Sequence, residues 1–381
     1  MSDISPAPRG AREELIGAPL GIKLDRSMPP VEVQAWLADA LPGLAAGLAP
    51  HTSVRDPRRR WQLLSALGRT DLVVARLLEG HLDALAVLAE AERPAVPSAL
   101  YGVWASASGG TGLSLRSPDR RDPGGFDQNR QESEPDATAG VLSGMMRFCS
   151  GAPLLDRALT TCRNEAGELL LLDILVRGPE LRPVPGSWPA LGMDASASVD
   201  VEVDELSVDE TAVVGPPGFY LERAGLPLGG IGVAAVWLGG LQGLVDATLR
   251  VLGDRTPDDH GLAHLGAVTV AVESAAATLI DTAHRLRRGP VDPVTSMAAL
   301  PPAELARIAL ICRSAVEAAV DVGTRRLPRV VGPVALGRDG DFAHRLADLE
   351  VFVRQHHAER DLARLGTAEF SEPWTVGPVV E

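Results

Sequence analysis

The chain contains few aromatic residues and few cysteines. Aromatic residues make up 4% of its 381 positions, whereas hydrophobic residues of all kinds make up 45%. The core must therefore be aliphatic and rich in alanine, a composition that favours helices over strands. The three cysteines, Cys149, Cys162 and Cys312, form no C-x-x-C pair. Their odd number argues against a disulfide framework and indicates reduced thiols, and we expect no metal site.

Lysine is also scarce, and the 50 acidic residues outnumber the 36 basic ones. Lys23 is the only lysine, and the formal net charge is -14. This argues against a general nucleic-acid surface because phosphate contacts need a basic face, although a local arginine cluster for a phosphorylated ligand stays open. No apolar run approaches the roughly 20 residues of a membrane span, and the N-terminus lacks the profile of a signal peptide. We expect a cytoplasmic protein without a membrane span.

The period of the hydrophobic residues changes twice along the chain. It is helical at first, alternates in a period of two from Ala99, and becomes helical again after Gly218. This pattern predicts a mostly α, α+β fold: an N-terminal helical domain, a central antiparallel β-domain and a C-terminal four-helix bundle. The expected boundaries are a flexible lead-in at 1–29, the helical domain at 30–97, the β-domain at 98–215, the bundle at 216–366 and a tail at 367–381.

Two polar or glycine-rich features need a separate interpretation. Residues 117–140 are dense in Asp, Arg, Pro and Gly, which predicts a long solvated loop, with substrate gating as the alternative. The glycines at 229–232 and 239–240 follow no strand and lack the full spacing of a dinucleotide-binding fingerprint. We expect these glycines to allow close helix packing.

Two segments of the predicted β-domain carry a family resemblance. The first, Leu142 to Ala152, reads LSGMMRFCSGA, and the second, Leu191 to Leu206, reads LGMDASASVDVEVDEL. Together they resemble the middle β-domain of the acyl-CoA dehydrogenase family. In that family the aromatic residue and the hydroxyl of the first segment meet the flavin ring, and Phe148 and Ser150 stand at those places. Helical segments flank the pair, so the resemblance covers most of the chain.

The resemblance implies a cofactor, a reaction and an assembly. The cofactor is FAD, and the reaction is α,β-dehydrogenation of an acyl-CoA or similar acyl-thioester, with an electron acceptor that stays open. A carboxylate takes the weakly acidic α-proton, which requires a desolvated base. The assembly is a homodimer or homotetramer formed through the C-terminal bundle.

The family supplies its base from one of two places. The commoner is a Glu-Gly pair eight residues after an Asp that resembles Asp348, but this chain has His356 and His357 there. The second is a Glu-Arg pair at the start of the first bundle helix, which Glu222 and Arg223 match. Glu222 is the preferred base, and a helix-capping role is its alternative. His356 continues an apolar helix face, so a core position and a position near the flavin both stay open.

Two further stretches depart from the family pattern. Trp104 and Ser106 stand where members contact flavin with Thr-Glu-Pro, and Arg255 is a remnant of an Arg that reaches a neighbouring subunit's FAD pyrophosphate. Two alternatives to the dehydrogenase follow. One is a flavin-dependent monooxygenase on the same fold, with His356 or His357 near the flavin, and the other is a non-catalytic partner subunit.

Overall fold

The computed structural model of the chain describes most of the sequence. The described residues are 10–22, 24–25, 28–48, 57–106, 112–117, 138–288 and 300–371. Most of the expected loop at 117–140 lies outside these residues, so neither the solvated loop nor the gating alternative is tested. Residues 1–9 and 372–381 also lie outside them.

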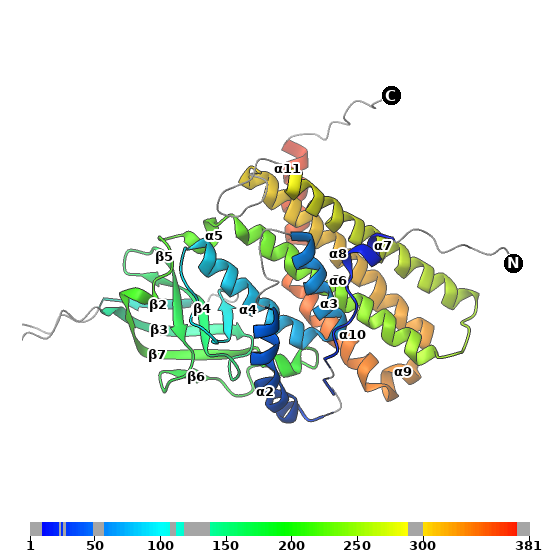
Figure 1. Cartoon of the computed structure of the whole chain (residues 1–381), viewed down its shortest axis with the longest axis horizontal. Helices are drawn as coiled ribbons and strands as arrows, with labels where there is room; N and C mark the ends of the chain where they lie inside the picture. Colours follow the sequence, from blue (N-terminus) through cyan, green and yellow to red (C-terminus); the bar gives the residue numbers. More distant parts are fainter. Residues whose placement is uncertain are drawn as a thin grey trace, which may run out of the picture.

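A bundle of long helices forms the larger part of the molecule (Figure 1). Its helices are α6 (Gly225–Leu252), α7 (Asp259–Arg288), α8 (Pro302–Val331), the short α9 (Pro333–Arg338) and α10 (Gly340–Phe352). Helix α6 is the core of the bundle, and Trp237, Leu241 and Leu244 on it are completely buried. The apolar periodicity after Gly218 thus predicted the four long helices of the bundle.

The N-terminal helices pack between the bundle and the sheet. They are α2 (Pro30–Leu48), α3 (Pro57–Thr70) and α4 (Leu72–Glu90). Asp71 caps α4 by accepting from the amides of Val73 and Val74, as an N-cap aspartate does. Helix α3 crosses α6 closely, since a Cβ on Gly68 would lie 2.1 Å from Val236 O and one on Gly239 would lie 2.0 Å from Ser65 O. The expected role of the 239–240 glycine pair in helix packing is confirmed.

The lead-in at 1–29 is not flexible throughout. Its described part contains the short helix α1 (Ala11–Leu15), and Leu15 and Ile16 are buried there. Ser65 donates its hydroxyl to Leu15 O at 2.9 Å, and the Arg12 amide donates to Glu273 at 3.1 Å. The expectation failed because a five-residue helix is too short to show a period, while two buried apolar side chains suffice to dock it.

The β-domain is one sheet of seven described strands, in the order β1-β4-β2-β3-β7-β6, with β5 paired to β4. Its strands are β1 (Tyr101–Trp104), β2 (Gly112–Arg116), β3 (Thr138–Cys149), β4 (Arg157–Asn164), β5 (Leu169–Leu175), β6 (Leu181–Pro183) and β7 (Val199–Asp209). The two motif segments lie side by side as β3 and β7, with Leu142 opposite Leu206.

The sheet is mixed, which corrects the wholly antiparallel expectation. Strand β4 lies between β1 and β2 and is parallel to both, while the other pairs are antiparallel. An alternating pattern identifies the two faces of a strand but carries no information about the direction of its neighbour. The three-part, mostly helical architecture itself is confirmed.

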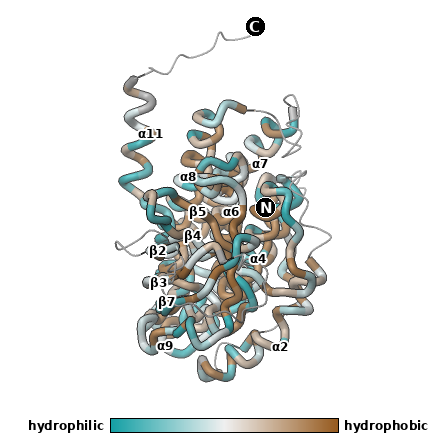
Figure 2. The backbone as a smooth tube through the Cα atoms, turned by 90° about the vertical axis from the view of Figure 1, so that its left-hand side faces the viewer, coloured by the Kyte–Doolittle hydropathy of each residue, from teal (hydrophilic) through white to brown (hydrophobic). Residues whose placement is uncertain are grey.

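Short helices connect and extend these parts. They are the turn α5 (Phe219–Glu222), the 3-10 turns η3 (Asp194–Ser196), η4 (Glu210–Ala212) and η5 (Val353–Gln355), and α11 (Glu359–Ser371), which runs into the tail expected at 367–381. Figure 2 shows α11 standing apart from the body of the molecule.

Two described helices, α6 and α7, are long and apolar enough to cross a membrane by length and composition alone. The most apolar window of α6 is 78% buried, as expected of the core helix of a bundle, and that of α7 is 33% buried. Exposed alanine, leucine and valine residues on α7, among them Leu262 and Val270, add to its hydropathy without belonging to the core. One or two helices of this kind are weak evidence for a membrane span.

Candidate functional site

The candidate site is a cavity of about 800 Å³ between the β-domain and the helices. Cavities of 300–1,000 Å³ are typical of cofactor and small-molecule sites. One wall, called here the β wall, is formed by Val103, Trp104, Ala105, Ser106, Phe148, Ser150, Trp188, Met193, Ser196 and Ser198. The opposite wall, called the helical wall, is formed by Arg76, Tyr220, Leu226, Arg313, Val351, Phe352, Arg354, Gln355 and His357.

Phe148 is the prominent aromatic residue of the β wall. It is 46% exposed, and its backbone is left-handed with φ +58°. The register between β3 and β7 shifts between Met146 and Cys149, and such a bulge redirects a side chain. The ring meets Trp188 edge to face, with 6.3 Å between centroids. A non-glycine residue held in this conformation with its ring exposed in a cavity indicates a ligand contact.

Trp104 and Ser106 continue the same wall from the end of β1. Trp104 is buried, its Nε1 donates to Ser150 O at 3.0 Å, and its carbonyl accepts from Thr160 Oγ1 at 3.0 Å. Trp104 thus fastens β1 to the segment after β3. The structure therefore brings four of the five expected cofactor contacts, Trp104, Ser106, Phe148 and Ser150, to one surface.

Three serine hydroxyls on the β wall form a chain of hydrogen bonds, and the donor of each bond in the chain can be assigned. Ser196 donates to Met193 O at 2.6 Å, and 2.8 Å separates the oxygens of Ser196 and Ser198 and of Ser198 and Ser150. Each hydroxyl has one proton, so Ser198 must donate to Ser196. By the same reasoning Ser150 must donate to Ser198. The oxygen of Ser150 therefore offers only lone pairs to the cavity.

Arg313 is the distinctive charge of the helical wall. Its guanidinium lies 4.7 Å from the ring centroid of Trp237 and donates to Gly230 O at 2.9 Å and Gln355 O at 3.0 Å. In the described part of the chain, no carboxylate lies within ion-pair distance of it. Burial lowers the pKa of Arg313, since the charged form loses hydration. Its remaining N–H groups are available to a ligand.

The two other arginines of the helical wall are neutralised by carboxylates. Arg76 donates to Glu79 at 2.8 Å, and Arg354 contacts Glu317 and Asp321, each at 3.1 Å. Buried or half-buried ion pairs of this kind cancel much of each other's field. Arg313 is therefore the cavity arginine without an ion-paired carboxylate among the described residues, and Asp361 and Glu79 act on its charge only from a longer distance.

Glu222 does not reach this cavity. It lies at the end of α5 and is exposed, whereas a proton-abstracting carboxylate needs a desolvated position. Its neighbour Arg223 is buried and pairs with Glu90 at 2.8 Å and Asp83 at 3.5 Å. The Glu-Arg pair thus joins α5 to α4 through Arg223. Tyr220, two residues earlier, is the member of this turn that lines the cavity, and burial raises its pKa to about 12.

The two adjacent histidines point to different surroundings. His356 is buried, its Nε2 is 3.1 Å from Ser314 Oγ, and its Nδ1 is 3.1 Å from Asp361 Oδ2, at an angle unfavourable for a hydrogen bond. Burial and the nearby Arg313 lower the pKa of His356. His357 lines the cavity instead. His356 therefore takes the core position left open by the sequence, and His357 is the imidazole that lines the cavity.

Arg255 lies away from the cavity of its own chain. Its guanidinium donates to Leu252 O at 3.3 Å and to Val251 O at 3.0 Å, the last carbonyls of α6. Within one chain Arg255 acts as a C-terminal cap of that helix. A contact with the cofactor of a neighbouring subunit stays a prediction.

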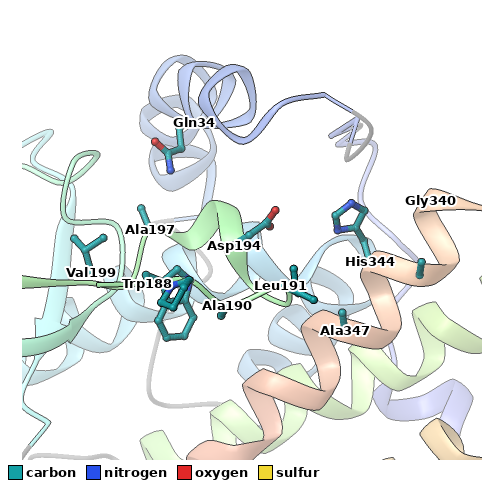
Figure 3. Close-up of a pocket in the computed structure, with 12 residues that line it drawn as sticks. Gln34, Trp188, Ala190, Leu191, Asp194, Ala197, Val199, Gly340, His344 and Ala347 are labelled. Atoms are coloured by element: carbon teal, nitrogen blue, oxygen red, sulfur yellow. The ribbon is translucent and has the colours of Figure 1, made fainter. Parts of the chain in front are cut away.

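A second cavity of about 640 Å³ lies on the other side of Trp188, between α2, the segment 188–199 and α10. Figure 3 shows Asp194 and His344 beside this space, below α2. Ligand atoms of Asp194, His344 and Asp348 lie within 4.8 Å of one another, the only three-residue group of this kind among the described residues. Asp348 already accepts from the Met193 amide at 2.6 Å, which ties α10 to the β wall.

Sequence reasoning missed Arg313, Tyr220 and the two inner serines as site residues. Ser196 and Ser198 stand inside the quoted segment Leu191 to Leu206, so their motif carried a signal. Arg313 lies on α8 with no motif around it, and only the tertiary structure brings it to the cavity.

Comparisons with known proteins identify the fold. No family model and no curated protein matches the chain. The complex of TdsC from Paenibacillus sp. A11-2 with FMN and indole has a TM-score of 0.70 at 16% identity, covering 92% of each chain. KijD3 in complex with FMN and a dTDP-sugar has a TM-score of 0.67 at 20% identity, covering 93% of this chain and 90% of that one. Methanesulfinate monooxygenase MsuC from Pseudomonas fluorescens has a TM-score of 0.64 at 17% identity, covering 92% of each chain. The chain therefore has the acyl-CoA dehydrogenase-like fold, as the two motif segments predicted.

Proposed function

We propose that the protein is a flavin-dependent monooxygenase whose flavin binds against the β wall. The observation that carries this proposal is the lining of the cavity. Phe148, Trp104 and Ser150 form a surface suited to an aromatic cofactor, while no described Asp or Glu lines the cavity. Dehydrogenation of a thioester needs a carboxylate or similar base at the α-carbon, whereas oxygenation does not. A bound reduced flavin would supply the electrons that activate O₂.

The residues of the cavity have distinct proposed roles. Phe148 and Trp188 hold the flavin ring from the side of the sheet, and Ser150 accepts a hydrogen bond from a ligand N–H or O–H. Tyr220 stays protonated at neutral pH because its pKa is raised to about 12, so it offers a donor. The imidazole of His357, which lines the cavity, can exchange a proton with a substrate. The apolar side chains of Leu226, Val351 and Phe352 exclude water.

FMN is the first candidate for the flavin. The structures of TdsC and KijD3 contain FMN, and TdsC is described as a dibenzothiophene monooxygenase. The FAD expected from the sequence depended partly on Arg255, which caps its own helix in a single chain. Titration of the purified protein with FMN and with FAD, followed by flavin absorbance, separates the two. Failure to take up either flavin would favour the non-catalytic partner subunit.

Two assays on the flavin-loaded protein test the reaction. An oxygenase incorporates ¹⁸O from ¹⁸O₂ into an organic substrate, with indole as the first probe, when reduced FMN is supplied. A dehydrogenase bleaches its flavin anaerobically on addition of an acyl-CoA. The decisive result against the proposal is anaerobic bleaching by an acyl-CoA that is lost in Glu222→Gln and kept in His357→Asn.

We also propose that the chain forms a homodimer or homotetramer through the bundle. Support comes from α7, whose outer side exposes Leu262 (48%) and Val270 (67%). Large apolar side chains on an exposed helix indicate a protein contact. Sedimentation of the wild-type protein and of Val270→Glu tests this, with a monomer at micromolar concentration in the wild type as the contrary result.

A further inference from the structure

We propose that Arg313 recognises an anionic group on the substrate, such as the carboxylate of a small organic acid with an apolar body. This inference deepens the proposed function, on which it rests for calling the anion a substrate. It starts from the charge of the cavity. The lining residues include three arginines and His357 but no described carboxylate side chain, so the cavity attracts anions.

Only one of the three arginines lacks a carboxylate partner among the described residues. Glu79 pairs with Arg76, and Glu317 and Asp321 pair with Arg354. The Arg313 guanidinium contacts two backbone carbonyls and the face of Trp237. These contacts fix the plane of the guanidinium without neutralising it. A rigid, half-buried guanidinium with free N–H groups is suited to bind a carboxylate by two hydrogen bonds.

The position of Arg313 favours the substrate over the cofactor as the source of the anion. Arg313 lies on the helical wall, whereas the aromatic and serine residues that suit the flavin ring lie on the β wall. Leu226 and Phe352 also belong to the helical wall, so an anion held there has apolar surface beside it. The expected ligand is therefore amphipathic, with one compact oxyanion and an aliphatic or aromatic body.

Benzoate and benzamide make a matched pair of probes because they share shape and differ in charge. Titration calorimetry with the flavin-free protein should show benzoate binding at least tenfold more tightly than benzamide. Arg313→Gln should remove this preference. The control Arg250→Gln should keep it, because Arg250 is paired with Asp339 and Asp341 at an exposed position outside the cavity. Circular dichroism and FMN uptake report whether each variant is folded.

Two further measurements keep the proposal falsifiable. Arg313→Lys retains the charge without the planar fork, so it should keep part of the preference even if Arg313→Gln does not fold. The same titrations on FMN-loaded protein identify the source of the anion. If FMN displaces benzoate, and if Arg313→Lys loses discrimination between FMN and riboflavin, Arg313 serves the cofactor phosphate and the proposal is wrong.

Equal binding of benzoate and benzamide by the wild-type protein would also overturn the proposal. Failure of the proposed function has a different signature. A protein that prefers benzoate through Arg313 but takes up no flavin would retain the anion site and lose the monooxygenase assignment. A protein that incorporates oxygen but shows no anion preference would retain the assignment and lose the site.

Discussion

The two walls of the cavity are built in opposite ways. The β wall comes from a few short stretches of sequence, and its described members are aromatic, apolar or hydroxylic, without a charged side chain. The helical wall collects its residues from α4, α5, α6, α8, α10 and the turn η5, and it carries all the arginines. We infer that cofactor chemistry and substrate chemistry reside on different structural supports, the ends of strands and a junction of helices. We expect mutations of the two walls to have separable effects.

The largest expected effect is a loss of folding stability. It concerns Arg223, which joins α5 to α4 within the helical wall. Arg223 is buried between Asp83 and Glu90, and its removal leaves two carboxylates without their cation. Arg223→Met should cost about 3–5 kcal/mol of unfolding free energy, measured by urea denaturation. Arg250→Met is the matched control, since Arg250 pairs with Asp339 and Asp341 at an exposed position and should cost at most about 1 kcal/mol. Similar costs in both variants would contradict the prediction.

The next largest effect is a loss of flavin affinity. It concerns the β wall and should leave the fold intact. Phe148 is 46% exposed and holds a left-handed backbone. Phe148→Ala should therefore weaken flavin binding by about 10-fold to 100-fold, from lost ring contacts, with little change in stability. Phe148→Tyr should retain binding. Flavin absorbance titrations provide the measurement, and unchanged affinity in Phe148→Ala would place the flavin elsewhere.

A smaller effect is expected from the serine chain. Ser198→Ala removes the acceptor of the Ser150 hydroxyl, so Ser150 becomes free to donate. Reduced flavin carries an N–H at N5 that oxidised flavin lacks, and an acceptor-only Ser150 prefers such a donor. The ratio of the affinities for reduced and oxidised FMN should therefore fall by about threefold to tenfold, the value of one neutral hydrogen bond. Ser114→Ala, on an exposed strand position, is the control. An unchanged ratio would show that Ser150 does not meet the flavin.

The smallest expected effect is on the pH dependence of folding stability. It tests the hydrogen bond that joins β1 to α4, one strand and one helix of the two walls. The Tyr101 amide in β1 donates to His81 Nδ1 in α4 at 3.2 Å, which requires neutral His81, and burial lowers the pKa of His81 below its ordinary 6.5. The unfolded chain therefore binds the proton more readily, so stability should be lost as pH falls from 6.5 through the folded pKa. The loss cannot exceed about 1.4 kcal/mol per pH unit from this group.

This hydrogen bond is tested by measuring the urea concentration at the midpoint of unfolding between pH 7.5 and 5. His81→Gln keeps an acceptor but does not titrate, so the difference between wild type and variant isolates His81 from other groups. His356, whose pKa is also lowered, contributes to both proteins equally. A pH profile that is parallel in wild type and His81→Gln would disprove the assignment.

The candidate site was predictable where its residues belong to continuous motifs. Phe148 and Trp104 lie at the ends of β3 and β1, and Ser150 and Ser106 follow these strands within two residues, so each motif brings two neighbouring residues to the cavity. Glu222 and His356 were expected from motif position and spacing, but nearby residues, Tyr220 and His357, line the cavity in their place. A helix changes its facing direction by about 100° per residue, so an uncertainty of one residue is enough to move a side chain out of a site.

The sequence by itself determined the three-part architecture, because hydrophobic period reports helix or strand locally and the two β segments carried a specific pattern. It also identified four residues of the β wall, Trp104, Ser106, Phe148 and Ser150. The tertiary structure alone decided the parallel strand pairs, the packing of the lead-in and the identity of the imidazole at the cavity. It alone placed Arg313 over Trp237 and facing the β wall. The physical reason is that these features depend on which helix faces meet, and that choice is made by close packing between segments far apart in the chain.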